Sequence, residues 1–244
     1  MEMTRVIHMV RIGRGFRNLA AFGVAATLFL SCAAAGDAKT WTVTTTADSP
    51  TDAGSIRYIV SNAGNGDTIK FTSSGANLTS ELKLDKKLTI QGPATIRQVA
   101  GSIVFLTIPE GKKITLTNLT LSGLVTDRYV SSIGNNGELS MKNCAVNAGG
   151  GIDNDGKLYM EGCTLAGLIA GVTNYGVLTM ENCVVKDCVN KDTSFNFSGV
   201  SNYIGAKATL KNCTISNNRT ASWGGGIMNY WGTVDMEKCT IAGN

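Results

Sequence analysis

The sequence predicts an all-β protein: a single right-handed parallel β-helix, a solenoid of stacked coils, with a short amphipathic helix capping its N-terminal end. Three observations predict this fold. A pattern of alternating apolar residues recurs through the chain, usually with a Cys at the same place. Five of the copies are preceded by an Asn that follows an Ile or Val by two residues. The 244 residues include 29 glycines and only 3 prolines, a composition typical of a β protein with many turns.

The repeated pattern indicates two short strands joined by a bend. Its apolar residues lie at alternate positions, which places them on one buried face of a strand. The alternation slips by one at an Asn, Gly or Lys and then resumes at the Cys, and this slip predicts the bend. The spacing between copies varies, as expected for a solenoid whose insertions leave as outer loops. The copies lie at 114–121, 137–146, 156–165, 176–185, 208–215 and 232–241.

A row of asparagines is expected to stack inside the solenoid. Each of them follows an Ile or Val by two residues, just ahead of a repeat. A buried Asn can bind the Asn of the next coil, side-chain amide to side-chain amide, and so satisfy polar groups inside a turn. The alternative is that these residues are ordinary turn formers. The predicted asparagine ladder is Asn135, Asn154, Asn174, Asn202 and Asn229.

Five cysteines share one position of the repeat and are predicted to form a cysteine ladder. Stacked coils lie about 4.8 Å apart, whereas a disulfide favours a Cβ separation of roughly 3.8 Å. We therefore expect buried free thiols that pack as small hydrophobes, with an occasional disulfide between neighbours as the alternative. Metal or cofactor binding is not expected, since the only histidine is His8 and no C-x-x-C is present. The cysteine ladder is Cys144, Cys163, Cys183, Cys213 and Cys239.

Residues 1–35 are predicted to be an export signal. A basic segment precedes the apolar run LAAFGVAATLFL, and small residues follow it. Cleavage is expected after Ala35 or Ala38, although Cys32 is an alternative lipid acceptor because a small residue precedes it. Without this leader the chain holds 18 basic and 17 acidic residues. This balance gives no reason to expect nucleic-acid binding, and no transmembrane span is predicted in the mature chain.

Residues 36–79 are predicted to cap the solenoid, and residues 80–244 to form its coils. Apolar residues at i, i+3, i+4 and i+7 predict a helix between two strands at 41–45 and 67–71. Gly64 is the expected C-cap of that helix, which would cover the first coil. The insertion at 187–199 predicts a protruding loop. No capping helix follows the last repeat, so we expect an open C-terminal end and a fragment of a longer surface protein with further C-terminal domains; the alternatives are that this end pairs with a partner or frays. The stripe of the helix consists of Ile56, Ile59, Val60 and Ala63.

Residues 42–71 (TVTTTADSPTDAGSIRYIVSNAGNGDTIKF) resemble the amino-terminal segment of bacterial secreted β-helix proteins that carry a CSLREA-type opening. The later repeats, with Gly-Gly-Gly-Ile and Asn-Cys-Thr-Ile-Ser-Asn-Asn, are similar to the right-handed parallel β-helix repeats of polymorphic outer-membrane proteins and related adhesins. The resemblance implies an exported protein at the cell surface, in the outer membrane or outside the cell. The segment GSIR at 54–57 departs from the opening motif, since it lacks the motif's Cys and Glu.

Five aromatic residues are predicted to form an outward-facing stripe along the coils. Three tyrosines each follow a ladder Asn, and they should point outward because their neighbours point inward. Aromatic rings stack on sugars and anchor protein partners, although the same rings could simply cover the turns. The predicted aromatic stripe is Tyr175, Tyr203, Tyr230, Trp231 and Trp223.

Catalytic residues are not predicted. The mature chain contains no histidine, which excludes His-based catalysis. Asp153 and Asp155 fall in one turn, where acidic side chains are usually solvated. We therefore expect a non-enzymatic, exported surface protein that binds glycans or cell-surface proteins of a host. The alternative is a polysaccharide lyase or glycoside hydrolase, because this fold often carries such enzymes.

Overall fold

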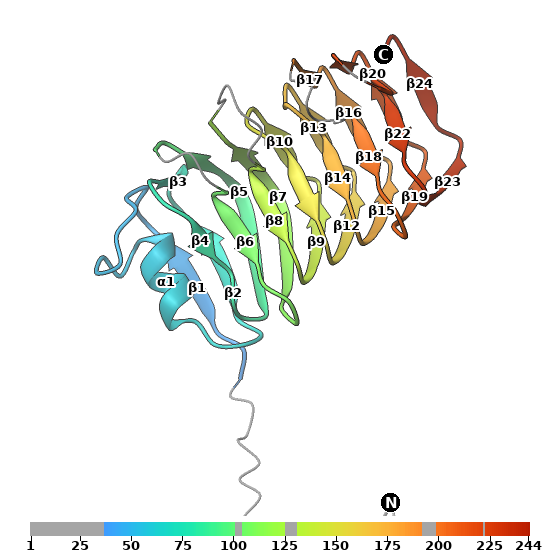
Figure 1. Cartoon of the computed structure of the whole chain (residues 1–244). Coiled ribbons are helices and arrows are strands. Elements are labelled where there is room, and N and C mark those ends of the chain that lie inside the picture. The colour runs from blue at the N-terminus through green and yellow to red at the C-terminus, as the bar shows by residue number, and fades with distance from the viewer. Residues whose placement is uncertain (1–36, 101–103, 125–130, 192–198, 222) are drawn as a thin grey trace, which may run out of the picture. The chain divides into compact units, whose positions relative to one another are not determined.

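The computed structural model describes residues 37–100, 104–124, 131–191, 199–221 and 223–244. The part of the chain from Asp37 to Asn244 is one compact unit. It is mostly strand, with one helix, and successive coils of parallel strands lie side by side (Figure 1). This arrangement is an all-β parallel solenoid. The predicted signal at 1–35 lies outside the described residues.

Two sheets, which we call the long sheet and the short sheet, line the solenoid (Figure 1). The early strands of the long sheet are β1 (Thr40–Val43), β2 (Thr68–Phe71), β3 (Gly75–Leu78), β5 (Leu88–Gln98) and β7 (Lys113–Ser122). After β7 each coil divides its part of the long sheet between two strands. The first of each pair is β9 (Glu138–Lys142), β12 (Lys157–Glu161), β15 (Val177–Glu181), β19 (Lys207–Lys211) or β23 (Thr233–Glu237). The second is β10 (Ala145–Asn147), β13 (Thr164–Ala166), β16 (Val184–Lys186), β20 (Thr214–Ser216) or β24 (Thr240–Ala242).

The short sheet supplies one strand per coil from the fourth strand of the chain onward. Its members are β4 (Leu82–Lys83), β6 (Leu106–Ile108), β8 (Ile133–Asn135), β11 (Ile152–Asn154), β14 (Val172–Asn174), β18 (Val200–Asn202) and β22 (Ile227–Asn229). A separate pair joins β17 (Val189–Asn190) to β21 (Arg219–Thr220). The registers align equivalent residues of successive coils, so that Met160 lies between Met141 and Met180. Each of these three side chains is fully buried.

The bend inside each repeat has a left-handed backbone. Asn143 has φ of 50°, Asn182 has φ of 54°, and Gly162 occupies the same place with φ of 63°. Glycine adopts this region freely, and Asn tolerates it better than most residues because its short side chain can hydrogen-bond locally. The backbone thus bends where the apolar alternation slips, at the residue type that accommodates the bend.

The helix α1 (Ile56–Asn62) lies beside β1 at the N-terminal end (Figure 1). Ser55 is its N-cap, and its hydroxyl accepts a hydrogen bond from the Tyr58 backbone N–H at 3.2 Å. Ile56 and Ile59 are buried, as the apolar stripe predicts. The prediction that Gly64 caps the helix was wrong. The C-cap is Ala63, which leaves the helix in extended backbone (φ −63°, ψ 148°) and needs no left-handed residue.

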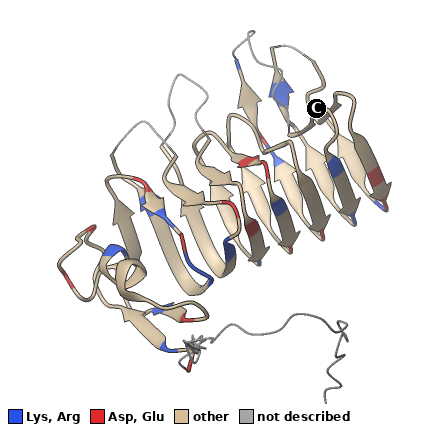
Figure 2. Ribbon diagram, turned by 60° about the horizontal axis from the view of Figure 1, so that its bottom comes forward, with Lys and Arg blue, Asp and Glu red and all other residues tan. Residues whose placement is uncertain are grey.

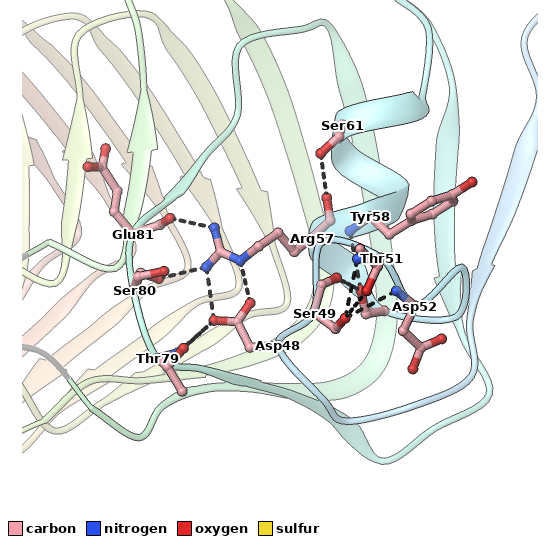
Figure 3. Close-up of polar contacts among 11 residues, drawn as sticks. Asp48, Ser49, Thr51, Asp52, Arg57, Tyr58, Ser61, Thr79, Ser80 and Glu81 are labelled. Atoms are coloured by element: carbon pink, nitrogen blue, oxygen red, sulfur yellow. Dashed lines mark hydrogen bonds and ion pairs between the residues drawn. The ribbon is translucent and has the colours of Figure 1, made fainter.

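An ion pair fastens α1 to the first coils (Figure 3). Arg57 donates to both carboxylate oxygens of Asp48, at 2.5 and 3.0 Å, and to the backbone carbonyls of Ser80 and Glu81. The backbone N–H and hydroxyl of Thr79 also donate to Asp48, each at 2.8 Å. Burial raises the pKa of Asp48, but the bonds from Arg57 and Thr79 outweigh it and hold the pKa below its usual value. The Asp48 side chain is 2% exposed.

The insertion at 187–199 is not wholly a protruding loop. Cys188, near its start, is 1% exposed, and its backbone N–H donates to the Asn218 side chain. Residues 189–190 then form β17, whereas residues 192–198 lie outside the described part.

At the C-terminal end of the solenoid, the last described coil exposes residues whose counterparts are buried in earlier coils. Met236 is 51% exposed and Ile241 is 47% exposed.

No helix within the described residues is long and apolar enough to cross a membrane.

Candidate binding surface

The turn between each short-sheet strand and the following long-sheet strand positions the candidate surface. Each turn begins with a ladder Asn pointing into the solenoid, and the next residue lies on the outside. In three successive coils that outer residue is Tyr175, Tyr203 or Tyr230. Backbone hydrogen bonds align each of these turns with the turn of the preceding coil. The Tyr203 N–H donates to the Asn174 carbonyl at 2.9 Å, and the Tyr230 N–H donates to the Asn202 carbonyl at 2.7 Å.

The five predicted ladder asparagines form one continuous chain of side-chain amide bonds. Each Nδ2 donates to the Oδ1 of the Asn in the next coil. The bonds run from Asn135 to Asn154, Asn154 to Asn174 and Asn174 to Asn202 at 2.7 Å each, and from Asn202 to Asn229 at 2.8 Å. Backbone carbonyls of the turn accept the second proton of each amide, such as Val177 O for Asn154 at 3.1 Å. The first four side chains are fully buried, whereas Asn229 is exposed.

The ladder begins at Asn135 because the coil before it offers no amide. Ile108 is the registered neighbour of Asn135 in that coil. The Oδ1 atom of Asn135 is therefore the one buried side-chain nitrogen or oxygen, among the described residues, without a hydrogen-bond partner. A buried acceptor left in this way costs free energy. The ladder thus carries one unsatisfied atom at its N-terminal end.

The three tyrosines stack on one another in a row that we call the tyrosine stack. The rings of Tyr175 and Tyr203 have centroids 4.7 Å apart and planes inclined by 17°. Tyr203 and Tyr230 meet edge to face, with centroids 6.4 Å apart. Tyr175 is 45% exposed and Tyr230 is 47% exposed. The facing ring surfaces of Tyr175 and Tyr203 are therefore covered, while about half of the Tyr175 and Tyr230 side chains remains accessible to solvent.

The two tryptophans of the predicted aromatic stripe are more open than the tyrosines. Trp231, next to Tyr230, is 77% exposed and has a left-handed backbone with φ of 60°. Trp223 is 66% exposed and lies on the loop before β22, at the opposite end of that strand from the tyrosine turns, so the structure does not bring it to the tyrosines. Exposed indole rings of this kind are uncommon without a partner, since Trp is highly buried on average. These two side chains offer the open aromatic faces that the tyrosine stack largely lacks.

Two carboxylates lie beside the tyrosine stack. Asp155 occupies the turn position of Tyr175 one coil earlier, and Asp153 lies two residues before it on β11. Burial raises the pKa of Tyr175 to about 12, with added contributions from Tyr203 and both carboxylates. Burial and the charge of Asp153 likewise raise the pKa of Asp155. The phenols therefore stay neutral at physiological pH, and the local potential is negative.

The cysteine ladder follows the bend of successive coils. Cys144, Cys163, Cys183 and Cys213 are buried free thiols, whereas Cys239 in the last coil is partly exposed. Several thiols donate to the carbonyl two residues earlier, as Cys183 does to Glu181 at 3.2 Å. Burial raises the pKa of the additional Cys188 to about 11. No set of three or more His, Cys, Asp or Glu side chains could hold a metal ion in the part of the chain described.

A second amide contact, absent from the sequence-based prediction, lies at the opposite side of the last coils. The Asn218 Nδ2 donates to the Asn244 Oδ1 at 2.9 Å and to the Val185 carbonyl at 3.1 Å. The Asn218 Oδ1 accepts from the Cys188 N–H at 3.1 Å. Both asparagines follow an Ile by three residues, and that repeat is the signal that could have indicated them.

A shallow groove lies on the outer face of the long sheet, over the strands that follow the turns. Its volume is about 360 Å³, and its lining includes Lys113, Glu138, Lys157, Tyr159 and Thr179. Lys113 pairs with Glu138. Charges of both signs are interspersed on this sheet, as where Glu138 lies between Lys113 and Lys157, instead of gathering in one patch (Figure 2). Such pairs are solvent-screened and neutralise one another, so they give no strong field for a charged ligand.

No protein-family model matches the chain, and no curated protein matches it.

Proposed function

We propose that this protein is an exported, non-enzymatic scaffold that binds glycans at a cell surface through the aromatic stripe. Its coils would wind as a right-handed parallel β-helix, with α1 as the N-terminal cap. The observation that carries the proposal is the row of exposed aromatic side chains on successive coils. The resemblance of residues 42–71 and of the repeats to secreted β-helix proteins supports export to the outer membrane or the extracellular space.

Two features of the stripe favour a glycan as the ligand. The tyrosine stack offers phenol hydroxyls, which both donate and accept hydrogen bonds and so match the hydroxyls of a sugar. Trp231, directly after Tyr230, offers an open ring face on which the C–H face of a sugar can stack. The asparagine ladder beneath holds the turns at a fixed spacing. A ligand would therefore meet a rigid surface and lose little further entropy on binding.

The direct test is a glycan-array screen of the mature protein, followed by titration of the best ligand. Tyr203→Ala, Tyr230→Ala and Trp231→Ala should each weaken binding by about tenfold, since a truncated aromatic anchor typically costs more than 1 kcal/mol. Tyr159→Ala, on the outer face of the long sheet, is the matched control and should leave affinity unchanged. Urea unfolding of each variant separates a binding defect from a folding defect.

Two results would count against this function. One is a screen in which no glycan and no cell surface binds the folded protein. The other is turnover, seen as unsaturated products absorbing in the near ultraviolet when an acidic polysaccharide is incubated with calcium. Turnover would favour the lyase alternative.

A further inference from the structure

We call the Tyr175 end of the tyrosine stack, which faces the preceding coil, its open end, and the geometry there defines a place for one more ring. The centroid spacing of 4.7 Å between Tyr175 and Tyr203 matches the spacing of stacked coils, about 4.8 Å. A further planar group stacked on Tyr175 would therefore lie level with the preceding coil. In that coil the turn residue is Asp155, which carries a short carboxylate instead of a ring.

Asp155 is held directly beside this place by the backbone. Asn154 and Asn174 are registered partners, and the Tyr175 N–H donates to the Asn154 carbonyl at 2.8 Å. The two turn residues that follow, Asp155 and Tyr175, thus occupy equivalent outer positions of adjacent coils. Tyr175 is 45% exposed and Asp155 is exposed. The outer face of the Tyr175 ring and the Asp155 carboxylate consequently border the same solvent-accessible place.

The charge at this place is negative. The carboxylates of Asp153 and Asp155 both act on the Tyr175 phenol, and Asp153 also acts on Tyr203. The Ser131 hydroxyl donates to Asp153 at 2.5 Å, which fixes one of the two carboxylates. No Lys or Arg forms an ion pair with Asp155 among the residues that the structure describes. An aromatic face flanked by an uncompensated carboxylate favours a cation.

We propose that the open end of the tyrosine stack binds an amino sugar of a glycan chain, with the C–H face of the sugar on Tyr175 and its ammonium group bound by Asp155. This inference rests on the proposed glycan-binding function and names the ligand class of that site. An amino sugar combines the two properties required here, an apolar ring face and a positive charge beside it. The remaining sugars would continue along the edges of Tyr203 and Tyr230 toward Trp231.

An arginine-bearing peptide could also place a planar cation on Tyr175, but the rest of the surface favours the glycan. A peptide anchor gains most of its affinity inside a well-packed, desolvated pocket. The stripe instead presents partly exposed tyrosine rings on three adjacent coils and the open Trp231 ring on the last of them. A hydroxyl-rich polymer matches this mixture over its whole length.

The test compares two probes that differ in charge and share one backbone. A hexamer of β-1,4-linked glucosamine carries ammonium groups, whereas the fully N-acetylated hexamer has neutral amides. Isothermal titration of the mature protein should show the amino hexamer binding at least tenfold more tightly at low salt. Asp155→Asn should remove about tenfold of the amino hexamer's affinity, since the variant loses the charge-assisted hydrogen bond to the ammonium group. The same change should leave the acetylated hexamer's affinity unaltered.

The matched control is Asp235→Asn, which removes one exposed carboxylate on the outer face of the long sheet, where it lies 3.8 Å from Lys207. It should change neither affinity. Equal binding of the two hexamers would overturn the amino-sugar assignment and leave glycan binding intact. Binding of neither hexamer would also overturn it, and the glycan array then decides whether the proposed function fails as well. Tighter binding of a short arginine peptide than of its citrulline counterpart, with no preference for the amino hexamer, would assign the site to a protein partner.

Discussion

Asn174→Ala removes the centre of the asparagine ladder and tests how much the ladder stabilises the solenoid. The Asn174 Nδ2 donates to the Asn202 Oδ1 at 2.7 Å and to the carbonyls of Gly176 and Lys207 at 3.2 Å each. Its Oδ1 accepts from the Asn154 Nδ2 at 2.7 Å. Alanine would remove all of these bonds and leave the buried Asn202 Oδ1 without this donor.

The expected cost follows from the bonds lost. Each neutral hydrogen bond contributes about 1 kcal/mol net, and a buried acceptor left unpaired costs about 1–3 kcal/mol, so the free energy of unfolding should fall by roughly 3–5 kcal/mol. Asn229→Ala is the matched control at the exposed end of the ladder. There Asn202 keeps the Ala206 and Thr233 carbonyls as acceptors, and the cost should be about 1 kcal/mol.

Urea unfolding followed by circular dichroism measures both values, with the slope m compared between variants to check that the unfolded states are alike. If Asn174→Ala destabilises the protein no more than Asn229→Ala, the asparagines are turn formers that act singly and the ladder reasoning is refuted.

Three further predictions concern other parts of the solenoid. Hydrogen bonds lower the pKa of Asp48 in the folded protein. The ionised carboxylate therefore stabilises the fold at any pH above about 3.9, the pKa of Asp in the unfolded chain, and this contribution is lost as the pH falls through the lower pKa of the folded state. Asp48→Asn should therefore cost about 3–5 kcal/mol at neutral pH and progressively less in acid, and pH-resolved urea titrations that show a constant difference would contradict this. Asn143→Val should destabilise the protein by about 1–2 kcal/mol more than Asn143→Gly, since only glycine adopts the left-handed bend freely, and thermal unfolding of the two variants checks the order. With a thiol reagent in the native state, Cys239 should react before the buried cysteines; simultaneous reaction of all would speak against a packed cysteine ladder.

The parts of this molecule that repeat were the parts that the sequence could predict. The alternation of apolar residues, the slip at Asn143 and Asn182 and the Asn positions recur in coil after coil, so each copy supports the same interpretation. Asn218 and Asn244 each follow the Ile of a second long-sheet strand by three residues. This pattern occurs in only two coils, too few to predict their contact. The ion pair between Asp48 and Arg57 joins two segments that lie outside the repeats. Asp48 also lies in a stretch whose composition is typical of a turn, so the sequence carries no signal for this pair.

The tyrosine stack marks a different limit. The sequence placed Tyr175, Tyr203 and Tyr230 on the outside of three turns, but it did not predict how their rings face one another. For Tyr175 and Tyr203 the stacked orientation follows from the match between coil spacing and ring stacking, which is a property of the assembled coils, whereas Tyr203 and Tyr230 meet edge to face. The wrong prediction for Gly64 has a local cause. The helix leaves directly into extended backbone at Ala63, so its end needs no left-handed residue.

The central claim is that equivalent side chains of successive coils meet inside the solenoid, and the asparagine side-chain amides test it most directly. A nitrogen-edited nuclear Overhauser experiment on labelled protein should connect these amide protons in the order Asn135, Asn154, Asn174, Asn202 and Asn229. Those of the buried members should exchange slowly with water. Amide protons that exchange rapidly and show no contact between Asn154 and Asn174 would contradict the stacked arrangement.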